Sequence, residues 1–304
     1  LHSFPTRRSS DLGCADAEYP DDASCIAAIR EYLGFFPSNC EGKPPRREPT
    51  EPQDRREESL ADLVPDSPRR AYDMKKLLEA VVDERRLFEL KPKWARNLVT
   101  ALARIDGRPV GIVANNPMFY AGALDVNSSD KAARFINLCD AFNIPLVFLQ
   151  DVPGFMVGSK VEHAGIIRHG AKMLYAVSRA TVPKVTVIVR KAYVAGYYVM
   201  CGKAYAPDLI VALPGAEISV MGAEGAVNII GRSAIEAADD PKATREAMLN
   251  AVRQNIDPYI SAGNAMIDDV IDPRETRPTI VKALRMSRNK HVTKPPKRHG
   301  VMPV

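Results

Sequence analysis

The loop with most promise for chemistry on a carbonyl group is 191–200 (KAYVAGYYVM), where Ala195 and Gly196 stand between an apolar run and a helical pattern. Backbone N–H groups at a helix start lack intrahelical acceptors and lie at the positive end of the helix dipole. Two of them can therefore hold a developing oxyanion. Small side chains would let a carbonyl oxygen approach these groups. Ordinary close packing is the alternative explanation for an Ala-Gly pair at such a place.

A second loop, 150–158 (QDVPGFMVG), follows another apolar run. Pro153 and Gly154 would shape its backbone, and Phe155 would offer an apolar surface to a ligand. Loops at the carboxyl ends of strands are where α/β folds place their sites, although a plain tight connection fits the same residues.

Other polar residues give weaker signals. Glu224, in the glycine-containing loop 220–227, is either an acid or base or a first-turn glutamate that complements the helix dipole. His163 and His169 lie in a helical stretch without a paired serine or cysteine nucleophile, so we expect polar packing for them.

The elements that must position these loops alternate along the chain. Short apolar runs rich in β-branched residues predict strands covered on both faces, at 109–114, 145–149, 184–190 and 208–212. Helical patterns lie between them at 128–142, with Asn127 and Ser128 as cap candidates, and at 164–179, with Ile166, Ile167, Met173, Leu174 and Ala176 facing inward. This alternation predicts an α/β fold.

The flanking regions are predicted to be helical or exposed. At the front we expect helices at 24–36 and 73–81, separated by a polar, proline-rich connector from Pro37 to Pro52. At the back we expect helices at 241–255 and 257–268, then one more helix and a basic tail within 274–304.

Composition restricts the class of protein. The 304 residues are 46% hydrophobic and 26% charged, which is typical of a globular protein with a real core. The net charge of +5 arises from basic runs near both ends, without any nucleic-acid-binding motif, so solvated surface is the simpler interpretation. Five cysteines without paired spacing argue against metal and disulfide frameworks and favour a reducing compartment. No apolar run approaches the roughly 20 residues of a membrane span.

Several segments together resemble the carboxyltransferase β chain of propionyl-CoA carboxylase and its methylcrotonyl- and acetyl-CoA relatives. The resemblance runs from about residue 17 to 304 and includes VVDERRLFEL (81–90) and KRHGVMPV (297–304). Its strongest parts are IDGRPVGIVANNP (105–117), LDVNSSDKAARFINLCDAFNIPLVFLQDVPGFMVG (124–158), GIIRHGAKMLYAVSRATVPKVTVIVRKAYVAGYYVM (165–200) and AEISVMGAEGAVNII (216–230).

The resemblance implies a crotonase-like spiral core of ββα turns, and this chain is similar to the C-terminal, carboxybiotin-binding half. It implies that the amides of Ala195 and Gly196 hold the biotin ureido oxygen, and that Pro153, Gly154, Phe155 and Tyr198 line the carboxybiotin pocket. The carboxyl group would pass to the α-carbon of a short-chain acyl-CoA, with propionyl-CoA as the first choice. Val194 replaces a family glycine, and Tyr198 stands where propionyl-preferring members carry aspartate.

The resemblance also implies partners. Biotin would arrive on a biotin carboxylase/biotin carrier α subunit, because no Ala-Met-Lys-Met attachment motif is present. A hexamer of β chains is expected, without metal, nucleic acid or membrane, in the cytoplasm or the mitochondrial matrix. The acyl-CoA half would lie elsewhere, so this half alone is expected to turn over weakly. The alternatives are a biotin-dependent decarboxylase or transcarboxylase subunit and a non-catalytic scaffold.

The predicted domain organisation has three parts. Residues 1–12 resemble a translated sequencing adapter and are set aside as non-native. Residues 13–58 are the helix and polar linker, and 59–304 are the carboxyltransferase domain with its helical tail.

Overall fold

The computed structural model describes residues 12–67, 70–295 and 300–303. The expected adapter-derived segment therefore lies outside the described residues except for Leu12, as do parts of the basic tail. No helix in the described ranges is long and apolar enough to cross a membrane.

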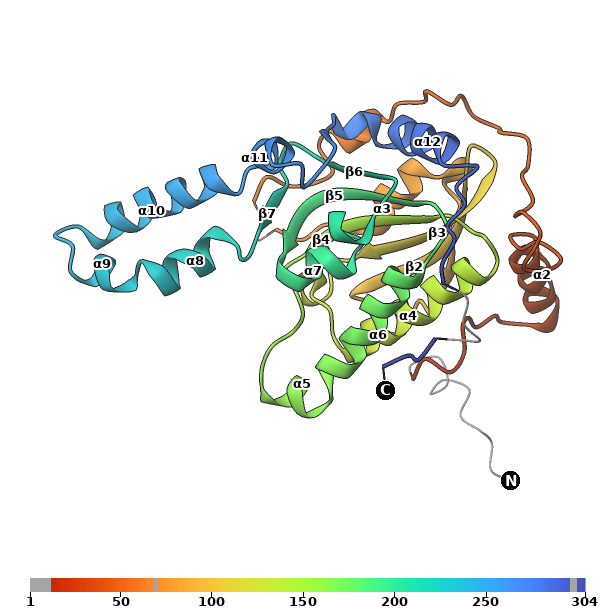
Figure 1. The fold of residues 1–304 in the computed structure, drawn as a ribbon, viewed down its shortest axis with the longest axis horizontal. Coiled ribbons are helices and arrows are strands. Elements are labelled where there is room, and N and C mark those ends of the chain that lie inside the picture. Colours follow the sequence, from red (N-terminus) through yellow and green to blue (C-terminus); the bar gives the residue numbers. More distant parts are fainter. Residues whose placement is uncertain (1–11, 68–69, 296–299, 304) are drawn as a thin grey trace.

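One mixed sheet forms the centre of the molecule (Figure 1), with the strand order β1-β2-β3-β4-β5-β6-β8 and β7 beside β5. Antiparallel pairing joins β1 to β2 and β2 to β3, whereas the remaining pairs are parallel. The strands are β1 (Phe88–Leu90), β2 (Leu98–Ile105), β3 (Arg108–Asn115), β4 (Leu146–Val152), β5 (Lys184–Tyr193), β6 (Leu209–Ala212), β7 (Glu217–Ser219) and β8 (Asp269–Val270). Every residue of β4 and β5 is buried, as continuous apolar runs predict.

Helices cover both faces of this sheet. One core joins it to α3 (Met74–Val81) and α12 (Thr276–Met286), and a second core joins it to α4 (Val126–Ala141) and α6 (Ile166–Arg179). The remaining α-helices are α2 (Asp22–Leu33), α5 (Ser159–His163), α7 (Val194–Val199), α8 (Ala223–Ile230), α9 (Arg232–Glu236), α10 (Pro241–Asn255) and α11 (Pro258–Gly263). Short 3-10 turns occur at Glu58–Leu60, Asp83–Arg85, Tyr120–Gly122, Lys203–Tyr205 and Pro273–Glu275.

An arm made of α8, α9 and α10 extends away from the sheet (Figure 1). Its longest helix, α10, buries none of its side chains, whereas Ala226 and Val227 of α8 are buried. Helix α10 was predicted from its sequence, but its separation from the core was not.

Four details differ from the sequence predictions. The cap of α4 is Asp125, whose side chain accepts the N–H of Ser128 at 2.8 Å in a capping box, so neither Asn127 nor Ser128 is the cap. Helix α11 ends at Gly263, before the end of the stretch 257–268 that was predicted as one helix, and β8 begins after that stretch, at Asp269. Ile167 is 77% exposed and does not face inward. Strands β1, β2, β7 and β8 were not predicted.

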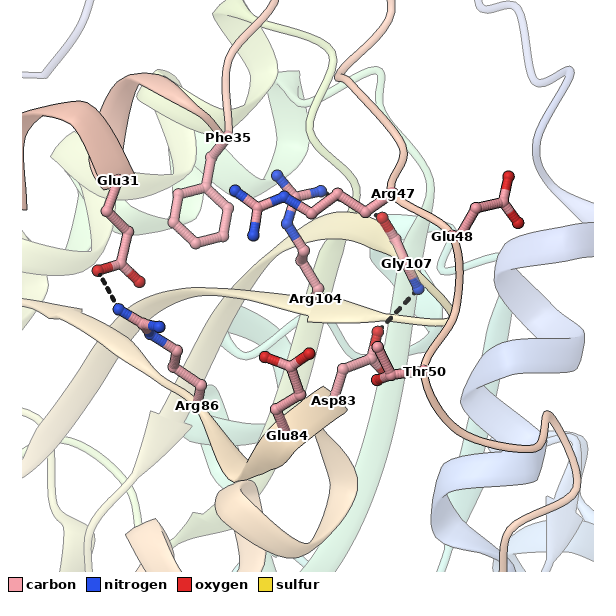
Figure 2. Close-up of a pocket in the computed structure, with 10 residues that line it drawn as sticks. All are labelled: Glu31, Phe35, Arg47, Glu48, Thr50, Asp83, Glu84, Arg86, Arg104 and Gly107. Carbon is pink, nitrogen blue, oxygen red and sulfur yellow. Dashed lines mark hydrogen bonds and ion pairs between the residues drawn. The ribbon is translucent and has the colours of Figure 1, made fainter.

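The turn between β2 and β3 shows why that hairpin forms. Asp106 and Gly107 both have positive φ, 54° and 71°, as a two-residue Asp-Gly hairpin turn requires. The buried Asp83 carboxylate accepts the N–H groups of both residues, at 3.1 and 2.7 Å, and the Gly107 bond is drawn in Figure 2. The fully buried Arg277 pairs with the same carboxylate at 2.7 Å.

The pocket around this turn is small and polar (Figure 2). It holds about 80 Å³, and an ion pair of 2.7 Å between Glu31 and Arg86 lies across it. The N–H of Arg47 donates to the Gly107 carbonyl at 2.9 Å, so the proline-rich connector is bound to the hairpin. We interpret this pocket as a structural junction because Glu31 and Arg86 pair across it, and because Asp83 and Arg104 both bond to the backbone of Gly107.

Candidate functional site

The turn after β5 is tighter than an ordinary strand-to-helix connection. Val194 has φ of 50°, a left-handed conformation that is rare for a β-branched residue, and α7 begins there. The reversal places Ala195 and Gly196 in the first helical turn, where N–H groups have no partner inside the helix.

Gly196 allows the loop after β4 to lie directly against this turn. A Cβ added at Gly196 would be 2.9 Å from Val152 Cγ2 and 3.1 Å from the Gly154 Cα. Real Cβ contacts are almost never that short, so a side chain here would push the two loops apart. Close packing and a role for the amide are therefore compatible at Gly196.

Phe155 is held in a defined place by its neighbours. Leu124 donates its N–H to the Gly154 carbonyl at 3.0 Å and accepts the Met156 N–H at 2.8 Å, which fixes both sides of Phe155. The phenyl ring lies against Gly170 of α6, where an added Cβ would be 3.0 Å from the ring. Gly170 thus makes room for the aromatic ring.

An open groove of about 350 Å³ lies between α6, α7 and the loop after β4. Its walls are mostly apolar, with Glu162 as the one acidic side chain among the lining residues. The lining includes Phe155, Met156, Ile166, Ile167, Leu174, Ala195 and Val199. The exposed Ile167 is thereby explained, because it forms part of a wall.

The structure brings together only some of the site residues that were predicted from the sequence. Phe155 and Ala195 line the groove, and Gly154 packs beside Gly196. Pro153 is half-buried in the same loop but is not a lining residue. Tyr198 lies on α7, 43% exposed, with its ring edge-on to Tyr197 at 5.3 Å.

A buried ion pair behind the turn was not predicted from the sequence. Asp151 is fully buried at the end of β4, and its Oδ2 lies 3.0 Å from Nη2 of Arg190 on β5. Its Oδ1 accepts the Lys191 N–H at 3.3 Å. Arg190 also donates to the Ser67 and Arg70 carbonyls, at 3.2 and 2.8 Å. Asp151 therefore holds the end of β5 just before the turn.

Two further ionisable groups are perturbed beside this pair. Burial lowers the pKa of the Lys191 ammonium, and the nearby Asp151 carboxylate opposes that shift. Burial raises the pKa of the Tyr193 phenol, and its hydrogen bond to Glu217 of β7 acts in the same direction. These side chains support the turn but do not line the groove.

The weaker candidates lie elsewhere. Glu224 is in the first turn of α8, on the arm. His169 Nδ1 is 2.7 Å from Asp130 Oδ2, which confirms polar packing, whereas His163 is exposed at the end of α5. Within the described ranges, no group of three or more His, Cys, Asp or Glu side chains could hold a metal ion.

Comparison with curated proteins shows extensive similarity. The chain is 45% identical over 300 residues to the propionyl-CoA carboxylase carboxyltransferase subunit of Haloferax mediterranei, covering 98% of this chain and 58% of that protein. It is 48% identical over 288 residues to the methylmalonyl-CoA carboxyltransferase 12S subunit of Propionibacterium freudenreichii subsp. shermanii, covering 94% and 54%. A methylmalonyl-CoA decarboxylase α subunit of Propionigenium modestum is 45% identical, over 97% and 57%.

These relatives are longer, and the chain spans a little over half their length. Among solved structures, a transcarboxylase 12S hexamer with methylmalonyl-coenzyme A bound superposes with a TM-score of 0.93 at 45% identity, covering 98% of this chain and 58% of that one. The expected crotonase-like α/β core is thus confirmed. The carboxyl transferase domain matches residues 7–302, and the chain belongs to this family.

Proposed function

We propose that the chain provides the carboxybiotin-binding face of an acyl-CoA carboxyltransferase. The observation that carries the proposal is the left-handed turn at Val194, which presents the Ala195 and Gly196 amides beside an apolar groove. The shared names of the relatives support transfer of a carboxyl group to or from a short-chain acyl-CoA, for which propionyl-CoA is our first choice.

Backbone amides suit this chemistry because they donate hydrogen bonds without transferring a proton. Carboxybiotin, when bound, would supply the carboxyl group, and its ureido oxygen would need hydrogen-bond donors for the negative charge that develops there. The Ala195 and Gly196 N–H groups would donate to this oxygen, with the first turn of α7 adding its dipole. Fixed donors of this kind stabilise the developing charge without reorganising during the reaction.

The groove walls would keep water away from the transferred group. Phe155 and Ile166 form apolar surface beside Ala195, and Gly170 lets the Phe155 ring lie close to α6. Exclusion of water strengthens the amide hydrogen bonds and limits loss of the carboxyl group by side reactions. Pro153 would set the loop conformation, and Tyr198 would contact the carboxybiotin carrier from the exposed side of α7.

Biotin would arrive on a biotin carboxylase/biotin carrier α subunit, and the acyl-CoA would bind to a second half-site. Hexamer assembly is stated for the solved transcarboxylase 12S structure, and we propose a hexamer for this protein too. A decarboxylase role is the second candidate, because the Propionigenium modestum relative is similar over 97% of the chain.

The test uses the full-length polypeptide with a matched biotinylated partner. ATP-dependent incorporation of labelled bicarbonate is measured with acetyl-, propionyl- and methylcrotonyl-CoA. We expect incorporation into propionyl-CoA, and a loss of about 100-fold or more in Gly196→Val, because the side chain displaces the amide.

The matched control is Gly263→Ala, at an exposed helix end where an added Cβ meets nothing within 4 Å. It should keep full activity, and the folding of both variants is checked by circular dichroism. Normal activity of folded Gly196→Val would refute the amide mechanism. Biotin-dependent release of carbon dioxide from methylmalonyl-CoA, without incorporation into any of the three substrates, would favour the decarboxylase.

A further inference from the structure

A second, larger cavity opens at the opposite edge of the sheet from the groove. It holds about 620 Å³ and lies where the parallel strands begin, since Arg108 starts β3, Pro145 precedes β4 and Pro183 precedes β5. The other walls come from the connector at 41–46 and from 284–292 at the end of α12 and beyond.

Cations dominate the polar part of its lining. Lys43, Arg46, Arg108, Arg288 and Lys290 line the cavity, and Glu41 is the one acidic lining residue. Three of the cations already have carboxylate partners, because Arg46 and Arg108 lie 3.1 and 3.8 Å from Asp106, and Lys290 lies 2.8 Å from Asp208. Lys43 and Arg288 form no ion pair with any residue that the structure describes.

Arg108 lies among like charges in this lining. Its Nε is buried without a hydrogen bond and lies 3.8 Å from the nearest recorded carboxylate oxygen, on Asp106. Burial lowers the pKa of this guanidinium, and the neighbouring Arg46 and Arg288 charges lower it further. A bound anion would relieve the repulsion between these like charges.

We propose that this cavity binds the phosphate group of a small organic phosphate of nucleotide size. Guanidinium groups recognise phosphate through paired N–H donors, and Arg46, Arg108 and Arg288 supply three of them. The remaining walls are mixed, with Asn143, Thr181 and His291 among the polar residues and with Pro44, Pro109, Pro183 and Leu284 available to contact the organic part of the ligand. The volume lies within the range of about 300–1,000 Å³ found for small-molecule sites.

The site is separate from the proposed carboxybiotin face. The ten residues of β5 run from the cavity at Pro183 to the turn at Val194, and at about 3.3 Å per residue this is roughly 30 Å. A ligand in the cavity therefore cannot contact Ala195 or Gly196 directly, and its binding can be measured independently of carboxyl transfer.

A purely structural role for the cations makes a different prediction. Positive side chains near a helix C-terminus stabilise it through the helix dipole, and Arg288 follows the end of α12 at Met286. In that case their removal would lower stability without any loss of ligand affinity.

The experiment is isothermal titration calorimetry of the full-length polypeptide with ADP, with inorganic phosphate as competitor. We expect saturable ADP binding that phosphate weakens, and a Kd raised tenfold or more in Arg108→Gln/Arg288→Gln. Arg288→Gln alone, at an exposed position, should raise the Kd by a smaller factor and remain folded. The matched control is Arg232→Gln. Arg232 is exposed on the arm, so this variant should bind ADP normally.

Three results would overturn the proposal. The first is the absence of saturable ADP binding. The second is unchanged binding in folded Arg288→Gln and in the double variant, which would place ADP at another site such as the one for acyl-CoA. The third is an equal loss in Arg232→Gln, which would indicate general electrostatic attraction.

Discussion

At each of the two ends of the central strands, a buried aspartate pairs with a buried arginine, but the two pairs have different roles. At the edge where β3 begins, Asp83 and Arg277 fix the Asp106–Gly107 hairpin turn. At the opposite edge, Asp151 and Arg190 fix the end of β5 before the turn at Val194.

The difference lies in what each pair supports. The Asp83 pair supports a turn that has the residues it needs, since Asp-Gly is well suited to two positive φ angles. The Asp151 pair supports a turn with valine at a left-handed position, which the local sequence disfavours. A strained backbone maintained by its surroundings is typical of functional sites. The comparison therefore predicts that one pair serves stability alone and the other also serves activity.

The largest expected effect is on stability, from Arg277→Met. The substitution removes the cation and leaves the Asp83 carboxylate buried and unpaired, which should cost about 3–5 kcal/mol of unfolding free energy. Urea unfolding measures this change. Arg285→Met is the control, because Arg285 is exposed on the same helix and should change stability little. Folded Arg277→Met should retain carboxyl transfer, and a specific loss of kcat would contradict the comparison.

The next effect, from Asp151→Asn, should fall on both stability and activity. Asparagine keeps the shape and can still accept the Lys191 N–H, but it leaves the Arg190 charge buried without a counter-ion. We expect a loss of about 3 kcal/mol in unfolding free energy, at the lower end for a broken buried pair. Because Asp151 positions the turn through Arg190, kcat should fall while KM for acyl-CoA changes little.

The opposite pattern, a higher KM with normal kcat, would mean that Asp151 affects substrate binding and not the turn. The double variant Asp151→Asn/Arg190→Gln provides a sharper check. Removal of both charges should restore part of the stability, because the Arg190 charge is no longer buried without a partner, although Lys191 still loses its ion pair with Asp151.

The sequence predicted the parts of the fold that local patterns encode. Strands β3 to β6 and helices α4 and α6 follow from apolar runs and helical spacing, and Phe155 and Ala195, which were expected in one pocket, both line the groove. Strand β2 was missed because LVTALARI has no strict alternation, and its pairing depends on a turn stabilised by Asp83, more than 20 residues away. The Asp151–Arg190 pair was missed for the same reason, since 39 residues separate its members. The signal available in the sequence was a pair of cations, Arg190 and Lys191, at the end of a buried strand.

The smallest expected effect tests the strained turn itself, through Val194→Gly. Left-handed backbone costs a non-glycine residue about 1–2 kcal/mol, whereas glycine adds backbone entropy to the unfolded chain. The balance should be a gain of about 0.5–1 kcal/mol in unfolding free energy. Since Val194 is 48% exposed, little packing is lost. If the Asp151 pair already holds the turn, kcat of Val194→Gly should be unchanged. The gain in unfolding free energy should be larger in the Asp151→Asn background, because the turn lacks that support there. Equal gains in both backgrounds, measured by urea unfolding, would show that the pair and the turn are independent.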